Sequence, residues 1–116
     1  MGIAWRIVQA HVADRAFTGE GARRYGGRWN SKGVAVVYTA GSISLAILEV
    51  LVHIPSYDIL DEYVYIPVEF DKKFALALKP DELPDNWNKD PSPQANKQIG
   101  DTWIENMKSV VLEVPS

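Results

Sequence analysis

The sequence predicts an α+β fold, and three observations support this class. Short apolar runs rich in β-branched residues indicate strands in both halves of the chain. Two segments of helical length lie among these runs. The predicted strands are not separated by regular helical crossovers, which argues against a doubly wound α/β sheet. We therefore expect a small α+β protein.

The strands are predicted from short runs that are apolar and bounded by turn residues. They are residues 3–8, 33–40, 63–70, 74–78 and 109–116. The run at 33–40, GVAVVYTA, is expected to be a buried strand because glycines bound a β-branched apolar core. Pro67 lies inside the third run and predicts an edge strand or a bulge there, because proline has no N–H to donate.

A helix is predicted over residues 41–55, GSISLAILEVLVHIP. Ser42 or Ser44 can cap its start, and Pro55 follows its end. The segment is apolar on most of its surface, so we expect the helix to be largely buried.

A second helix is predicted over residues 93–107, and we expect Gly100 to interrupt it. Two segments are expected to be loops. Residues 14–33 hold five of the eight glycines, and residues 79–93 hold four prolines.

The composition excludes several classes of protein. The chain has 116 residues, 47% of them hydrophobic and 23% charged, which fits one folded domain and not a disordered chain. It has no cysteine, so disulfides, thiolate nucleophiles and cysteine metal sites are excluded. Its two histidines have no zinc-binding spacing, and we expect no metal. No signal peptide or bilayer-length apolar run is visible, so we expect a cytoplasmic protein without membrane contact.

The charge is distributed unevenly along the chain. Net charge is −3, but all five arginines lie in the first 28 residues. Residues 1–32 carry a net charge of +4, and residues 33–116 carry −7. The overall acidity disfavours direct nucleic-acid binding. Arginine suits planar partners such as phosphate or carboxylate, although pairing with the acidic part of the chain is an alternative.

The glycine-rich region resembles a phosphate-binding loop in composition only. Its Gly19–Arg24 stretch has arginine where the dinucleotide fingerprint needs a third glycine. The Gly-Lys-Ser/Thr sequence that a P-loop needs is also missing. Arg23, Arg24 and Arg28 accompany Tyr25 and Trp29, a combination that suits a ligand with phosphates and flat rings. The alternative is a mobile loop whose aromatic side chains pack on the core.

Glu49 is the most informative single residue. Ser42, Ala46, Glu49 and His53 form one narrow small or polar stripe on an otherwise apolar helix. A glutamate there is expected to face a cleft, meet an arginine, or become protonated with a raised pKa. The alternative is a solvent-facing stripe with a contact between Glu49 and His53.

Six short motifs are spread over nearly the whole chain. They are GEGAR (19–23), YGGRWNS (25–31), VYT (37–39), AILEVL (46–51), GDTW (100–103) and VPS (114–116). In this order they resemble the RES domain, a family named for an arginine, a glutamate and a serine, so residues 1–116 are expected to form a single RES-like domain. Family members usually continue past the serine, so a C-terminal tail is expected to be missing or not shown here.

The resemblance implies an ADP-ribosyltransferase-like fold, with two packed sheets and a few helices around a central cleft. It also implies a toxin that depletes NAD⁺ and pairs with an Xre-type helix-turn-helix antitoxin. Carried over onto this sequence, the catalytic residues are Arg28, Tyr38, Glu49 and Ser116. The residues expected to bind the substrate are Arg28, Tyr38, Trp29, Asn30 and Arg24.

This chemistry is cleavage of the nicotinamide–ribose bond, with NAD⁺ as substrate and no cofactor. Glu49 would stabilise an oxocarbenium-like ribose, Arg28 would hold the pyrophosphate, and Tyr38 would stack on nicotinamide. Water or inorganic phosphate would then attack, giving a glycohydrolase or a phosphorylase. The alternatives are ADP-ribosyl transfer to a protein or small molecule and, from another class, a non-catalytic binding module or a ribonuclease-type toxin.

Overall fold

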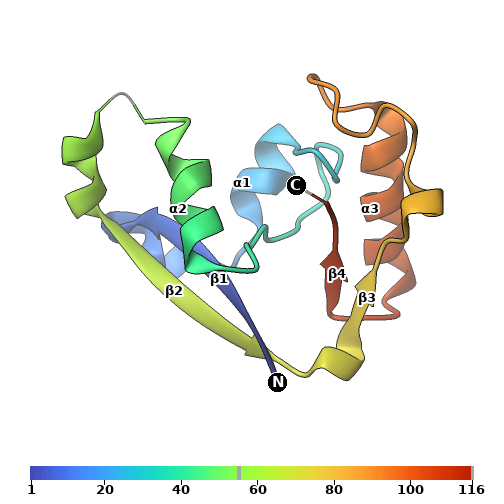
Figure 1. The fold of residues 1–116 in the computed structure, drawn as a ribbon, viewed down its shortest axis with the longest axis horizontal. Coiled ribbons are helices and arrows are strands. Elements are labelled where there is room, and N and C mark those ends of the chain that lie inside the picture. The colour runs from blue at the N-terminus through green and yellow to red at the C-terminus, as the bar shows by residue number, and fades with distance from the viewer. Residues whose placement is uncertain (55, 116) are drawn as a thin grey trace. The chain divides into compact units, whose positions relative to one another are not determined.

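The computed structural model describes residues 1–54 and 56–115 and confirms the α+β class (Figure 1). The strands are β1 (Gly2–Gln9), β2 (Tyr63–Phe70), β3 (Ala75–Ala77) and β4 (Val111–Glu113). The α-helices are α1 (Glu20–Tyr25), α2 (Ile43–Leu51) and α3 (Gln94–Asn106). Short 3₁₀ helices span Ala10–Arg15, Tyr57–Glu62, Lys72–Phe74 and Pro80–Glu82.

The chain forms two compact units, and both are built from separate stretches of sequence. Unit 1 comprises residues 1–18 and 37–71. Unit 2 comprises residues 19–36 and those after residue 71. Each unit contains one two-stranded sheet, with β1 and β2 in unit 1 and β3 and β4 in unit 2.

The sheet of unit 1 is antiparallel and explains how Pro67 is accommodated. Strands β1 and β2 pair over their whole length, with Trp5 opposite Pro67. The Trp5 N–H and C=O are instead bonded to Ala40, each at 2.8 Å, on the other side of β1. Trp5 and Pro67 are therefore a non-hydrogen-bonded pair, and the Pro67 nitrogen points away from β1. This confirms the edge position predicted for Pro67.

Helix α2 begins where the sequence predicts. The Ser42 Oγ accepts a hydrogen bond from the Leu45 N–H at 3.1 Å, which caps the helix. Ala46 is 5% exposed on the helix that packs against β1, whereas Leu48 is 58% exposed. The expectation that this helix is largely buried is therefore wrong. The helix ends at Leu51, and the predicted boundary at Pro55 lies outside the described residues.

Residues 33–40 do not form the predicted strand. Among the described residues, only Ala40 of this segment forms a β-bridge, and its partner is Trp5. The carbonyl of Val34 accepts from the Asn30 side chain at 3.0 Å, and that of Tyr38 accepts from the Arg6 guanidinium at 2.9 Å. Side chains therefore supply donors that a neighbouring strand would otherwise provide.

Unit 2 contains a parallel strand pair that the sequence reasoning did not anticipate. Strands β3 and β4 are parallel, with Ala75 opposite Val111 and α3 in the connection between them. Parallel neighbours need such a crossover. Helix α1 lies within the segment predicted as a loop, so that prediction is wrong over Glu20–Tyr25.

Helix α3 continues through Gly100, so the predicted interruption is also wrong. Gly100 is buried against the main chain of Trp29, and a Cβ atom at this position would overlap the Trp29 carbonyl. The glycine therefore permits a close approach between α3 and the segment before Ser31. None of the helices in the described ranges has the length and hydrophobicity of a transmembrane segment.

Candidate functional site

Unit 1 contains a pocket of about 270 Å³. It is lined by residues from the middle of β1, the segment 38–40, α2 with the turn after it, and the start of β2. The polar lining residues include Arg6, Tyr38, Glu49 and His53, together with the hydroxyl-bearing Thr39 and Tyr63. Two of the residues that the sequence marks as catalytic, Tyr38 and Glu49, are thus in the same pocket.

Helix α2 directs the predicted stripe at this pocket. Three of its four residues line the pocket, Ala46 and Glu49 on α2 and His53 in the turn after it, whereas Ser42 is not among the lining residues. Glu49 is exposed to solvent and not buried. Within residues 1–54 and 56–115, no ion pair joins it to His53 or to an arginine. Glu49 therefore lines the pocket and is also exposed to solvent, which agrees both with a cleft-facing residue and with a solvent-facing stripe.

Arg6 is a pocket residue that the sequence reasoning did not single out. Its Nε donates to the Ala16 carbonyl at 2.6 Å, and its Nη1 donates to the Tyr38 carbonyl at 2.9 Å. Burial lowers the pKa of the Arg6 guanidinium below its usual value, although an arginine remains charged at neutral pH. The available signal was a lone charge in the middle of the strand-like run IAWRIV.

Arg28 lies in unit 2, where the loop after residue 83 holds it. Its Nη1 donates to the carbonyls of Trp87 at 3.0 Å and Lys89 at 2.8 Å. Its own carbonyl accepts from the Ser92 hydroxyl at 2.7 Å. The side chain is half-buried, and these contacts fix both its main chain and one end of its guanidinium.

Trp29 and Asn30 have structural positions in unit 2. Asn30 is 0% exposed, and its Nδ2 donates to the carbonyls of Ala22, Ser31 and Val34 at 2.9, 3.3 and 3.0 Å. Trp29 is also buried. Neither side chain offers a surface to a ligand in this structure. Their role in substrate binding stays a prediction, and their burial favours a role in shaping the segment that carries Arg28.

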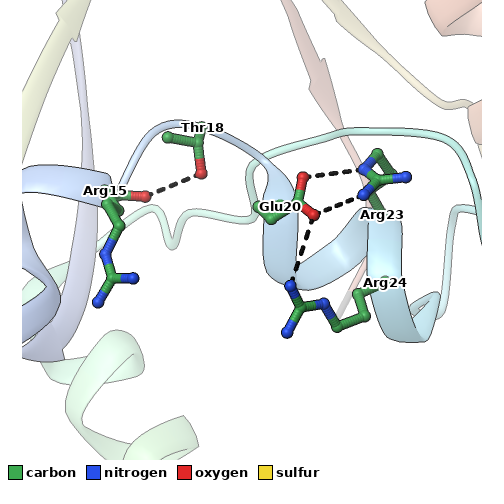
Figure 2. A network of polar contacts seen from close by, with 5 residues as sticks. All are labelled: Arg15, Thr18, Glu20, Arg23 and Arg24. Carbon is green, nitrogen blue, oxygen red and sulfur yellow. Dashed lines mark hydrogen bonds and ion pairs between the residues drawn. The ribbon is translucent and has the colours of Figure 1, made fainter.

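Arg24 belongs to a charge cluster on α1 (Figure 2). Glu20 receives two bonds from Arg23, at 2.6 and 2.8 Å, and lies 3.8 Å from the Arg24 guanidinium. The bond from Arg23 holds the pKa of Glu20 below its usual value, and Glu20 raises the pKa of Arg23. Among the described residues, Arg15, Arg23 and Arg24 form ion pairs with Asp14 and Glu20 of the basic N-terminal part. Arg24 is exposed, and its role in substrate binding stays a prediction.

Two further expectations concern Ser116 and metals. Ser116 lies outside the described residues. Within the part of the chain that is described, no group of three His, Asp or Glu side chains is placed to hold a metal ion.

Comparison with known proteins gives concordant matches over almost the whole chain. The model of the RES domain family matches residues 3–116. A protein named "Toxin Res" from Yersinia enterocolitica is 43% identical over 97% of this chain and 74% of its own length. A "Toxin Res" from Photorhabdus laumondii is 36% identical over 98% of this chain and 73% of its own. A "Prs ADP-ribosylating toxin" from a Sphingobium species is 36% identical, with 97% and 73% covered.

Proposed function

Because the chain belongs to the RES domain family, we propose that it is a toxin that binds NAD⁺ and cleaves the nicotinamide–ribose bond. The observation that carries this proposal is the pocket of unit 1, where Tyr38 and Glu49 both line the wall. A carboxylate and an aromatic ring in one pocket suit a charged sugar transition state next to a flat leaving group. An ADP-ribosyltransferase-like arrangement of the sheets stays a prediction.

Each residue then has a distinct role. As the bond to nicotinamide breaks, the ribose becomes an oxocarbenium-like cation, and Glu49 stabilises it electrostatically. Tyr38 stacks on the nicotinamide ring. Arg28 binds the pyrophosphate through guanidinium N–H groups other than the Nη1 contacts, while its loop keeps the fork in place. Nicotinamide leaves as a neutral molecule, so no general acid is required.

The acceptor completes the reaction after nicotinamide leaves. Attack by water gives ADP-ribose, and attack by inorganic phosphate gives a phosphorylated ADP-ribose. NAD⁺ is consumed as the substrate, and the proposal needs neither a cofactor nor a metal.

Transfer of ADP-ribose to another molecule is a second candidate function. The observation that favours it is that the Sphingobium relative is named an ADP-ribosylating toxin. The same cleavage would occur, and an acceptor on a protein or small molecule would replace water or phosphate.

A cell that produces a toxin consuming NAD⁺ needs an inhibitor of that toxin. We propose a cytoplasmic complex with an Xre-type helix-turn-helix antitoxin. A carboxylate-bearing segment of that partner would bind the arginine site in place of the pyrophosphate. Co-expression of the adjacent gene product would then restore growth and inhibit NAD⁺ turnover.

The decisive experiment is incubation of the purified protein with NAD⁺ while nicotinamide release is measured, with and without phosphate. Release only with phosphate identifies a phosphorylase, and release without it identifies a glycohydrolase. Release that appears only when a protein fraction is added, with labelled ADP-ribose on a protein band, identifies a transferase. An absence of NAD⁺ consumption under all three conditions contradicts the proposal and favours a binding module or ribonuclease-type toxin.

A further inference from the structure

The segment that carries Tyr38 pairs with β1 at Ala40 but does not continue as a regular β-ladder to Tyr38. Trp5 and Ala40 form a hydrogen-bonded antiparallel bridge. The next such pair, two residues along each chain, would be Ile7 and Tyr38. The Tyr38 carbonyl instead accepts from Nη1 of Arg6 at 2.9 Å. The Arg6 side chain therefore supplies the donor that the Ile7 main chain would supply in a continuing ladder.

Arg6 is itself well fixed for this task. Its main chain lies in the middle of β1, opposite Ile66 of β2. Its Nε donates to the Ala16 carbonyl at 2.6 Å, at the end of the first 3₁₀ helix. One planar guanidinium thus joins β1, the end of that helix and the Tyr38 segment. Lysine cannot reproduce this, because its ammonium is a single point on a flexible stem.

Arg6 is partly buried, so its charged guanidinium needs hydrogen-bond partners within the protein. Moving a charged group out of water is unfavourable unless it is paired or hydrogen-bonded. Desolvation by burial lowers the pKa of Arg6, and in the described ranges no carboxylate forms an ion pair with it. Its two recorded bonds go to main-chain carbonyls, so the role of the charge is to hold backbone.

We propose that Arg6 is a positioning residue that fixes Tyr38 in the pocket of unit 1 by replacing the missing ladder bond. This inference rests on the proposed function, because it takes Tyr38 as a residue that contacts the substrate. Arg6 acts on the reaction through Tyr38. A displacement of Tyr38 by about 1 Å is enough to lower turnover by up to about 10²-fold.

A double-mutant cycle tests this coupling. Arg6→Met removes both donors and keeps an unbranched apolar stem, and Arg6→Lys keeps the charge without the fork. Both are made in the wild-type protein and in Tyr38→Ala, and Arg15→Met is the control because Arg15 is exposed in the same unit. We expect Arg6→Met and Arg6→Lys to lower kcat/KM for NAD⁺ about 10- to 100-fold in wild type, but less than about 3-fold in Tyr38→Ala. Arg15→Met leaves kcat/KM unchanged.

A second readout does not depend on turnover. The ring resonances of Tyr38 in protein labelled at tyrosine are assigned with Tyr38→Phe. We expect them to shift or broaden in Arg6→Lys and to stay in place in Arg15→Met.

The possible results separate the two proposals. Equal losses from the Arg6 variants in both backgrounds, or an unchanged Tyr38 resonance in Arg6→Lys, would overturn the positioning role. If wild type consumes no NAD⁺, the proposed function fails, and the resonance of Tyr38 alone decides whether Arg6 positions it. If Arg6→Met does not fold, Arg6→Lys carries both tests.

Discussion

The guanidinium of Arg28 is attached to the protein's own main chain, with Nη1 2.8 Å from the Lys89 carbonyl oxygen. The same nitrogen also donates to the Trp87 carbonyl, and the Ser92 hydroxyl donates to the Arg28 carbonyl. The Nη1 end of the Arg28 guanidinium is therefore already hydrogen-bonded within unit 2. The loop that contains Trp87, Lys89 and Ser92 therefore also sets the direction in which the remaining N–H groups of the Arg28 guanidinium point.

Replacing Arg28 is expected to weaken NAD⁺ binding. Arg28→Ala removes charge-assisted bonds to the pyrophosphate, and we expect KM to rise about 10- to 100-fold. Arg28→Lys keeps the charge but loses the planar fork, so it does not restore the wild-type KM. Steady-state kinetics of nicotinamide release measure both variants against Arg15→Ala, which changes an exposed arginine. Full turnover in Arg28→Ala at low NAD⁺ would contradict this role.

Glu49→Gln is expected to separate catalysis from folding. The substitution keeps the shape of the side chain and removes its charge, so stabilisation of the cationic transition state is lost. We expect kcat to fall by about 10²–10³-fold, with NAD⁺ binding retained. Because Glu49 is exposed and has no ion pair among the described residues, the melting temperature should not change.

The control for this variant is Glu69→Gln, an exposed glutamate on β2 outside the pocket. It should leave both kcat and melting temperature at wild-type values. A Glu49→Gln protein with a lower melting temperature but normal turnover per folded molecule would identify a structural glutamate instead.

Two glycines in helices are expected to respond to alanine with opposite signs. At Gly21 a Cβ meets nothing within 4 Å, so Gly21→Ala should stabilise the protein by about 0.5–1 kcal/mol. At Gly100 a Cβ overlaps the Trp29 carbonyl, and Gly100→Ala should destabilise it by about 1–3 kcal/mol. Urea unfolding measures both values. Stabilisation by Gly100→Ala would show that α3 does not approach Trp29 as described.

Asn30 is expected to matter for stability. Its side chain serves carbonyls of Ala22, Ser31 and Val34 from a fully buried position. Asn30→Ala should lower the free energy of unfolding by about 1–3 kcal/mol, mainly through the Val34 carbonyl, because the Ala22 and Ser31 carbonyls also accept from the Gly26 and Val34 N–H groups. Asn88→Ala is the matched control, because Asn88 is exposed in the same unit. Equal unfolding midpoints for the two variants would refute the structural role.

The Glu20 and Arg23 pair predicts a specific pH dependence. The pKa of Glu20 is lowered in the folded protein, so its ionised form is favoured there. Its contribution to stability is present above the pKa of the unfolded chain and is lost as pH falls through the folded pKa. We expect Glu20→Gln to lower the melting temperature at neutral pH, with the difference vanishing in strong acid.

Titration of the Glu20 carboxyl by NMR checks the cause directly. Its pKa should lie below the usual glutamate value in wild type and return toward that value in Arg23→Gln. A Glu20 pKa that does not respond to Arg23→Gln would contradict the pairing in Figure 2.

Sequence patterns predicted those elements whose cause is local. Strand β2 spans the predicted residues 63–70, and Ser42 caps α2, because alternation and capping depend on neighbours in sequence. The missing strand at 33–40 has a partly non-local cause, because Arg6 donates to the Tyr38 carbonyl from 32 residues away. Asn30 donates to the Val34 carbonyl from within the same part of the sequence. Among the site residues, Glu49 could be predicted from the sequence, because it lies on a polar stripe of an otherwise apolar helix. Arg6 was not, because its partners Ala16 and Tyr38 lie 10 and 32 residues away in sequence.

The interleaving of the two units has a consequence for synthesis of the protein. The chain leaves unit 1 after residue 18, returns at residue 37 and leaves again after residue 71. When the ribosome has synthesised the first 36 residues, both units are therefore still incomplete. The pocket with Glu49 can close once β2 has emerged, whereas the strand pair of unit 2 waits for β4 at Val111–Glu113. Translation that stops before β4 yields a chain with the glutamate pocket and with the Arg28 partners Trp87, Lys89 and Ser92, but without the strand pair of unit 2.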